Sequence, residues 1–305
     1  MKARLHNAYV ISLRRRVLAG MAGLALSFCA GSTWADTAGR VDAHAETQEE
    51  ILKVVTVPLE ESARQHLYYF PKLLELALSK TEASEGPFEI EPYPRVLTGA
   101  RFLADLVKGE GIDVVWSMTN AELERTLLRI PISLLRGLNS HRVFLIREED
   151  QEKFSAVKSL DDLKAFRAGM VSHWPDTDIL RSNGLPVVAS SHYELVFDML
   201  EAKRVDYFPR GLYEVWQEHE LHKKQGVAIE NSLMLYYYGP MFFFVNREDK
   251  ALADRIERGL RMAIEDGSFE ELFFSIPGFR RGYEEISSNG RRLFKLPLNP
   301  AKDAQ

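Results

Sequence analysis

Residues 168–211 read AGMVSHWPDTDILRSNGLPVVASSHYELVFDMLEAKRVDYFPRG, and this stretch decides the fold class. Short β-prone runs at 168–171, 187–189 and 205–208 alternate with helical patterns at 176–181 and 193–202. The Asn183-Gly184 pair closes the first of these helices. Strands that alternate with helices are typical of parallel sheets covered by helices. The stretch therefore predicts a small α/β lobe.

The same alternation precedes this stretch, with predicted strands at 53–57, 88–93 and 112–116 and predicted helices at 67–79 and 100–108. A further strand is predicted at 142–146, an aromatic β-prone stretch at 232–246, and a long helix from Ala251 to about Phe274 that packs back on the first lobe.

The fold expected is two α/β lobes, each a mainly parallel sheet flanked by helices. The first comprises residues 50–143 and 244–298, and the second, inserted lobe comprises 144–243. The chain would cross between them near 142–148 and 238–246, and two hinge strands would let the lobes close on a ligand.

The N-terminus predicts export. Lys2, Arg4 and the run 14–16 precede an apolar stretch from Val17 to about Gly31 that is shorter than the ~20 residues of a membrane-spanning helix. Ala35 closes a pattern of small residues, so we expect a signal peptide at 1–35, a mature chain from Asp36 and a disordered leader at 36–49. An uncleaved anchor is the alternative, and twin-arginine and lipoprotein signals fit poorly. The expected location is the periplasm.

Composition excludes several classes of function. The chain has one cysteine, Cys29, which lies inside the predicted signal peptide. The mature protein would therefore have no cysteine for disulfides or thiolate chemistry. Cleavage removes five of the 39 basic residues and none of the 44 acidic ones, and the formal net charge falls from −5 to about −10. An acidic chain without a basic stripe is a poor nucleic-acid binder. We expect no nucleic-acid partner and no cofactor.

Several segments resemble the type II periplasmic solute-binding proteins, in particular family 3, the amino-acid-binding components of ABC transporters. The segment Asp113-Val114-Val115-Trp116-Ser117-Met118-Thr119 is similar to a strand of that family with a Met-Thr ending. The step Ile130-Pro131, the strand Arg142-Val143-Phe144-Leu145 and the segment 157–163 (VKSLDDL) match its crossover and its entry into the second lobe. The resemblance covers most of residues 50–290 and implies ligand capture between two lobes.

Two departures from that family concern ligand charge. Relatives that bind amino acids hold the α-carboxylate with an arginine soon after the Met-Thr strand, whereas here the spacing is shifted, leaving Arg125 as the candidate. Relatives often place an aspartate for the ligand's ammonium after the strand that corresponds to 205–208, whereas this chain has Arg210. An arginine there predicts an anionic ligand group. The alternative is an ion pair between Arg210 and Glu214.

The remaining candidates lie where strands end, which is where open α/β sheets bind ligands. Trp116 is the last residue of a predicted first-lobe strand, with core packing as the alternative. Trp174 follows a second-lobe strand and is expected to stack on the ligand. Asp176 is a ligand contact or a helix cap. The predicted ligand-binding residues are Trp116, Thr119, Arg125, Trp174, Asp176, Thr177 and Arg210.

The expected function is capture of a small, anion-bearing molecule, amino-acid-like or an organic acid, by a monomer that delivers it to a membrane permease of an ABC transporter. The alternatives are a dehydratase-like enzyme of the same fold and a sensor without a transporter. No Gly-x-Ser-x-Gly, His-Glu-x-x-His or phosphate-loop motif is present, so no catalytic residue is assigned. No metal site is assigned either, because His219 and His222 fit a solvated helix face.

Overall fold

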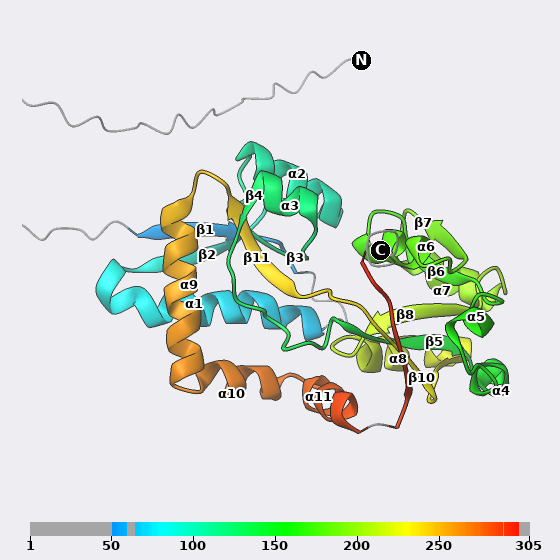
Figure 1. Ribbon diagram of the computed structural model, residues 1–305. Coiled ribbons are helices and arrows are strands. Elements are labelled where there is room, and N and C mark those ends of the chain that lie inside the picture. The colour runs from blue at the N-terminus through cyan, green and yellow to red at the C-terminus, as the bar shows by residue number, and fades with distance from the viewer. Residues whose placement is uncertain (1–50, 60–64, 289, 299–305) are drawn as a thin grey trace, which may run out of the picture. The chain divides into compact units, whose positions relative to one another are not determined.

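The computed structural model describes residues 51–59, 65–288 and 290–298. The predicted signal peptide at 1–35 and the predicted leader at 36–49 lie outside the described residues. In the described ranges, no helix is both long and apolar enough to span a bilayer. Two mixed sheets flanked by helices make up this part of the chain (Figure 1), which confirms the predicted α/β class.

The first sheet has five strands in the order β2-β1-β3-β11-β4. The pairs β1–β2 and β1–β3 are parallel, as a βαβαβ unit requires, and β11 runs antiparallel to β3 and β4. Its strands are β1 (Leu52–Thr56), β2 (Phe88–Pro92), β3 (Val114–Met118), β4 (Leu127–Arg129) and β11 (Met241–Asn246). The helices between or after them are α1 (Tyr69–Glu85), preceded by the 3₁₀ turn η1 (Gln65–Tyr68), α2 (Gly99–Lys108), α3 (Ala121–Thr126), α9 (Lys250–Glu265), α10 (Ser268–Ser275) and α11 (Phe279–Ser287).

The second sheet has seven strands in the order β12-β10-β5-β8-β6-β7, with β9 also paired to β5. The parallel group β7–β6–β8 is the unit that residues 168–211 predict. Its strands are β5 (His141–Arg147), β6 (Ala168–Val171), β7 (Val187–Ser190), β8 (Tyr207–Gly211), β9 (Val227–Ile229), β10 (Leu233–Tyr236) and β12 (Arg292–Lys295). Its helices are η2 (Glu148–Asp150), α4 (Gln151–Ser155), α5 (Leu160–Leu163), α6 (Pro175–Ser182), α7 (Glu194–Glu201), α8 (Val215–His222) and η3 (Lys223–Gln225).

The connections between the sheets differ from the expected pair of hinge strands. The chain leaves the first sheet after β4 and returns between β10 and β11, so β5 lies wholly in the second sheet. The strand β12 pairs in parallel with β10, although the predicted boundaries place residues 244–298 in the first lobe. This pairing adds a third connection. Only the tertiary fold reveals this connection, because the sequence of a four-residue strand does not identify the strand with which it pairs.

Two long predicted elements are each divided at a glycine. Gly267 has a φ of +83°, a left-handed conformation that ends α9 and lets α10 begin in a new direction. The aromatic stretch 232–246 is divided around Gly239-Pro240 into β10 and β11, which belong to different sheets. A Cβ on Gly239 would lie 3.1 Å from the Met118 sulfur, so the small residue allows the connection to pass β3 closely.

Candidate functional site

The carboxyl end of β8 carries a buried cluster of charged side chains. Arg210, 4% exposed, donates from Nε to Glu218 Oε2 at 2.6 Å and from a terminal nitrogen to Glu218 Oε1 at 2.7 Å. The same guanidinium lies 2.7 Å from Glu214 Oε2. Glu214 and Glu218 are four residues apart at the start of α8, so one helical turn presents both carboxylates to the strand. One cation therefore faces two buried anions.

Aromatic rings surround this guanidinium. The Arg210 carbon Cζ lies 4.8 Å from the centre of the Trp174 ring, 4.6 Å from that of Phe208 and 5.5 Å from that of Tyr193. The Tyr193 hydroxyl also donates to Glu218 Oε1 at 2.7 Å. Cation–π contacts of this kind hold a guanidinium in place where water is largely excluded. The guanidinium is therefore held by the residues that precede α6 and α7 and by β8.

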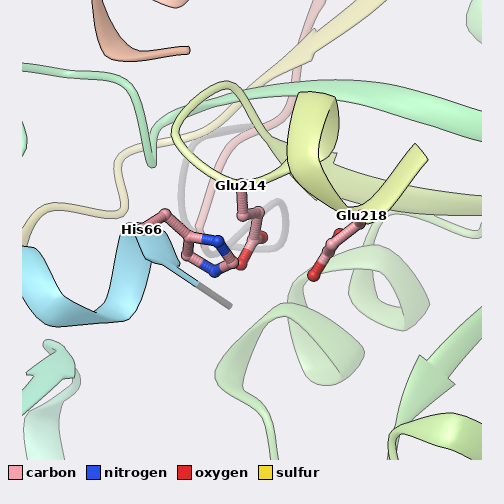
Figure 2. Close-up of side chains that lie close together, drawn as sticks. All are labelled: His66, Glu214 and Glu218. Atoms are coloured by element: carbon pink, nitrogen blue, oxygen red, sulfur yellow. The ribbon is translucent and has the colours of Figure 1, made fainter. Parts of the chain in front are cut away.

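A residue from the first lobe completes the cluster. His66 lies in the 3₁₀ turn before α1, is 2% exposed, and points toward Glu214 and Glu218 (Figure 2). Its backbone N–H donates to Gln217 Oε1 at 3.0 Å, and its Nδ1 lies 2.8 Å from the same oxygen. The Gln217 amide oxygen can only accept hydrogen bonds, so the proton of the second contact is on His66 Nδ1. Neutral His66 therefore has its lone pair on Nε2.

Ligand-type atoms of His66, Glu214 and Glu218 all lie within 4.8 Å of one another. One imidazole and two carboxylates are donors that transition metals accept. However, both Glu218 oxygens already accept hydrogen bonds from Arg210, whose positive charge opposes a nearby dication. This donor set is better suited to hydrogen bonding with a single positive charge than to a metal centre.

Burial and pairing act in opposite directions on the charges of the cluster. Burial alone would raise the pKa of Glu218, but the Arg210 charge and its hydrogen bonds, with smaller contributions from His66 and Tyr193, hold the pKa below its usual range. Burial alone would lower the pKa of Arg210, but Glu214 and Glu218 raise it well above the usual value. Pairing with each other therefore favours the charged forms of Arg210 and Glu218.

A second buried ion pair joins β5 to the start of α6. Arg142 donates to Asp176 Oδ1 from Nε at 3.0 Å and from a terminal nitrogen at 2.5 Å, and the Tyr237 hydroxyl donates to the same oxygen at 2.5 Å. Arg142 also donates to Asn139 Oδ1 at 2.7 Å. Burial would raise the pKa of Asp176, but Arg142 and the Tyr237 hydrogen bond lower it below its usual range. This pair is neutral overall.

The structure brings together two of the seven predicted ligand contacts, Trp174 and Arg210. The Asp176 carboxylate accepts hydrogen bonds from Arg142 and from the Tyr237 hydroxyl at Oδ1. Thr177 is fully buried and its hydroxyl donates to the Val171 carbonyl at 2.7 Å. The Arg210–Glu214 ion pair, the alternative interpretation of the sequence, is present.

The three predicted ligand-binding residues of the first lobe, Trp116, Thr119 and Arg125, have other surroundings. The Trp116 ring stacks on Phe70 with centroids 4.9 Å apart, which is partial core packing. Thr119 donates to Glu124 Oε1 at 2.8 Å, and Arg125 is exposed on α3. Sequence reasoning missed His66, Gln217 and Glu218. The spacing of Arg210, Glu214 and Glu218 at intervals of four carried a signal, whereas nothing in the sequence connects His66 to α8.

No family model and no curated protein matches this sequence, but solved structures match its fold. An ancestral arginine-binding protein bound to glutamine is 16% identical with a TM-score of 0.55, covering 75% of this chain and 98% of its own. The arginine-, lysine-, histidine-binding protein ArtJ from Geobacillus stearothermophilus is 12% identical with a TM-score of 0.54, covering 75% and 96%. The ancestral amino acid-binding protein AncCDT-1, a precursor of cyclohexadienyl dehydratase, is 13% identical with a TM-score of 0.52, covering 74% and 94%. The chain therefore has the two-lobed type II periplasmic binding fold.

Acid is expected to weaken the folded state through the two clusters. The pKa values of Asp176 and Glu218 are lowered in the fold, so their stabilisation is present above the unfolded pKa values of about 4. It is lost as the pH falls through the folded values. Urea unfolding between about pH 6 and pH 3 should show a falling free energy of unfolding. The fall should be smaller in the double variant Arg142→Met, Asp176→Asn, and an equal fall would contradict the assignment.

Proposed function

We propose that this protein is an exported solute-binding protein that captures a small molecule between its two lobes. The observation that carries the proposal is the contact of His66, from the turn before α1, with Gln217 and the buried charges of β8 and α8. It supports capture because the segments that meet there come from both lobes and carry polar groups suited to a ligand. Delivery to a membrane permease and a monomeric state are parts of the same proposal.

The charge of the ligand is where this proposal departs from the sequence-based expectation. An anionic group at Arg210 would have to displace Glu214 or Glu218 from hydrogen bonds of 2.6–2.7 Å. Bidentate pairing of arginine with a carboxylate is among the stronger polar contacts in proteins. We therefore leave an anionic anchor at Arg210 out of the proposal and place Trp174, the half-buried ring beside it, at the ligand.

The test is a thermal-shift screen of the protein recovered from the periplasm after expression of the full chain. Amino acids, amines, organic acids, sugars and short peptides are the probes, because a ligand of the native state raises the melting temperature by mass action. Recovery of the probe unchanged supports binding, whereas conversion to a product supports the dehydratase-like alternative. Retention of the chain in the cytoplasm would contradict export.

Trp174→Ala is expected to weaken binding of whichever probe stabilises the wild type by about tenfold or more, since an aromatic contact contributes about 0.5–1.5 kcal/mol beyond buried area. Calorimetry on both proteins measures the loss. Trp216→Ala is the matched control, because Trp216 is a second tryptophan, on α8, that lies beside the Arg281 guanidinium. Equal losses in the two variants would remove Trp174 from the site.

A further inference from the structure

Buried apolar residues of both lobes contribute to one hydrophobic core. Leu73 and Val114 of the first lobe belong to the same contiguous cluster as Val143 and Phe208 of the second. Lobes that rotate freely about a hinge would each need a core of their own, because rotation exposes whatever apolar surface they share. The shared core therefore points to a contact that holds the two lobes against each other.

One aromatic ring of the second lobe enters a group of rings from the first. Tyr213 lies between β8 and α8 and is 8% exposed. Three rings meet it edge-on: His66 with centroids 5.6 Å apart, and Phe70 and Phe279 with centroids 6.4 Å apart. Edge-to-face contacts of this kind stabilise aromatic pairs beyond the area that they bury. Separating the lobes would break all three contacts and expose the Tyr213 ring.

Helix α11 approaches the second lobe at a glycine. Gly282 is buried inside α11, and a Cβ at this position would lie 2.6 Å from the carbonyl oxygen of Leu212, which directly follows β8. The same Cβ would lie 3.2 Å from Leu138 Cδ2, in the connection that leads into β5. Only a residue without a side chain allows α11 to come this close. The helix also packs on α1 and α10 of the first lobe (Figure 1).

An ion pair fastens α11 to the second sheet. Arg291, which directly precedes β12, donates from Nε to Glu285 Oε1 of α11 at 2.6 Å. Its guanidinium also lies 3.7 Å from Glu230 Oε2, a fully buried carboxylate, and donates to the Leu233 carbonyl of β10 at 3.3 Å. One arginine therefore joins α11 to the strands β10 and β12.

We infer that α11 is a latch that holds the two lobes against each other in the protein without a ligand. Tyr213 and the Leu212 carbonyl form the second-lobe side of the latch, and α11 with the rings of η1 and α1 forms the first-lobe side. A solute that binds between the lobes would enter after this contact has opened. The inference goes beyond solute binding and does not depend on it, because it concerns the motion of the protein alone.

The test measures the distance between the lobes by double electron–electron resonance. The full chain with Cys29→Ser carries nitroxide labels at Glu122→Cys on α3 and Asp178→Cys on α6, two exposed positions in different lobes. Without any added compound, the labels should give one narrow distance, with fewer than about a tenth of the molecules outside it. A broad or double distribution would overturn the latch, because the lobes would then open while α11 is intact.

Two variants release the latch. Tyr213→Ala removes the ring from its three partners, and Gly282→Ala places a Cβ against the Leu212 carbonyl. Each should raise the fraction of molecules outside the wild-type distance about tenfold or more. Together they should raise it about 100-fold, enough to detect an open state that the wild type populates at about 0.1%. Circular dichroism checks folding, and either single variant suffices if the other folds poorly.

Tyr283→Ala is the matched control. Tyr283 lies on the same helix, but its ring packs on Phe273 and Phe274 of the first lobe. This variant should keep the wild-type distance, and a distribution as broad as that of Tyr213→Ala would overturn the latch in favour of a general loosening of α11. A folded double variant that keeps the single wild-type distance would overturn it as well. The thermal-shift screen tests solute binding separately, so the failure of either idea leaves the other standing.

Discussion

Replacing Arg142 with methionine is expected to lower the free energy of unfolding by about 3–5 kcal/mol, the usual cost of leaving one member of a buried ion pair without its partner. Arg142 is 4% exposed and Asp176 is 8% exposed, so neither charge is well solvated. The Asp176 carboxylate would retain only the Tyr237 hydroxyl among its two side-chain donors. Urea unfolding near pH 7 measures the loss.

The double variant Arg142→Met, Asp176→Asn should recover much of this stability, since replacing both charges by neutral groups removes the desolvation cost. Recovery will be incomplete because Asn139 and Tyr237 lose a partner. A double-mutant cycle with Asp176→Asn isolates the coupling between the two residues. The matched control is Arg258→Met, which breaks an exposed pair with Glu85 and should lower the stability far less than Arg142→Met, because water screens both charges. Equal losses in the two methionine variants would show that the Arg142 pair is not a buried, coupled one.

Gly259→Ala is expected to destabilise the protein by about 3 kcal/mol, although alanine is the better helix former by about 1 kcal/mol. Figure 1 shows α9 crossing α1. Gly259 lies inside α9 and faces Ala77 of α1. A Cβ at this position would lie 1.8 Å from the carbonyl oxygen of Ala77, which is backbone and cannot rotate away. The helices would have to separate, which would loosen the core around Leu74 and Ile256.

The control for this substitution is Gly99→Ala at the start of α2, where no atom lies within 4 Å of the added Cβ. It should change the free energy of unfolding by less than about 1 kcal/mol. Chemical denaturation of both variants gives the comparison. A stabilised Gly259→Ala variant would mean that α1 and α9 do not pack as closely as described.

Local patterns predicted the parallel parts of both sheets correctly. The alternation in 168–211 produced β6, α6, β7, α7 and β8 in order, because each element carries its own hydrophobic period and turn residues. Boundaries were less accurate where a strand continues past the apolar run. The strand β8 extends to Gly211 and includes Arg210, because pairing with β5 continues to the residue pair Arg142 and Gly211. Arg210 therefore lies inside the sheet.

The candidate site was predicted only in part, and the reason is electrostatic. Sequence position suggested that Arg210 is an anchor for an anion, but the charge available at a site is the sum over all groups that the fold brings together. Glu218 lies eight residues further along the chain, and His66 lies 144 residues before Arg210, in an element of the other lobe. The carboxylates of Glu214 and Glu218 pair with the Arg210 guanidinium, which the sequence alone left open.

The sequence by itself determined the α/β class, the two lobes and the order of most elements, because helix and strand periodicity, glycine turns and apolar runs are local properties of the chain. Tertiary structure alone decided the pairing of β12 with β10, the close crossing at Gly259, and the neutralisation of Arg142 and Arg210. These features depend on distances between residues far apart in the chain. Packing sets those distances, and no local pattern encodes them.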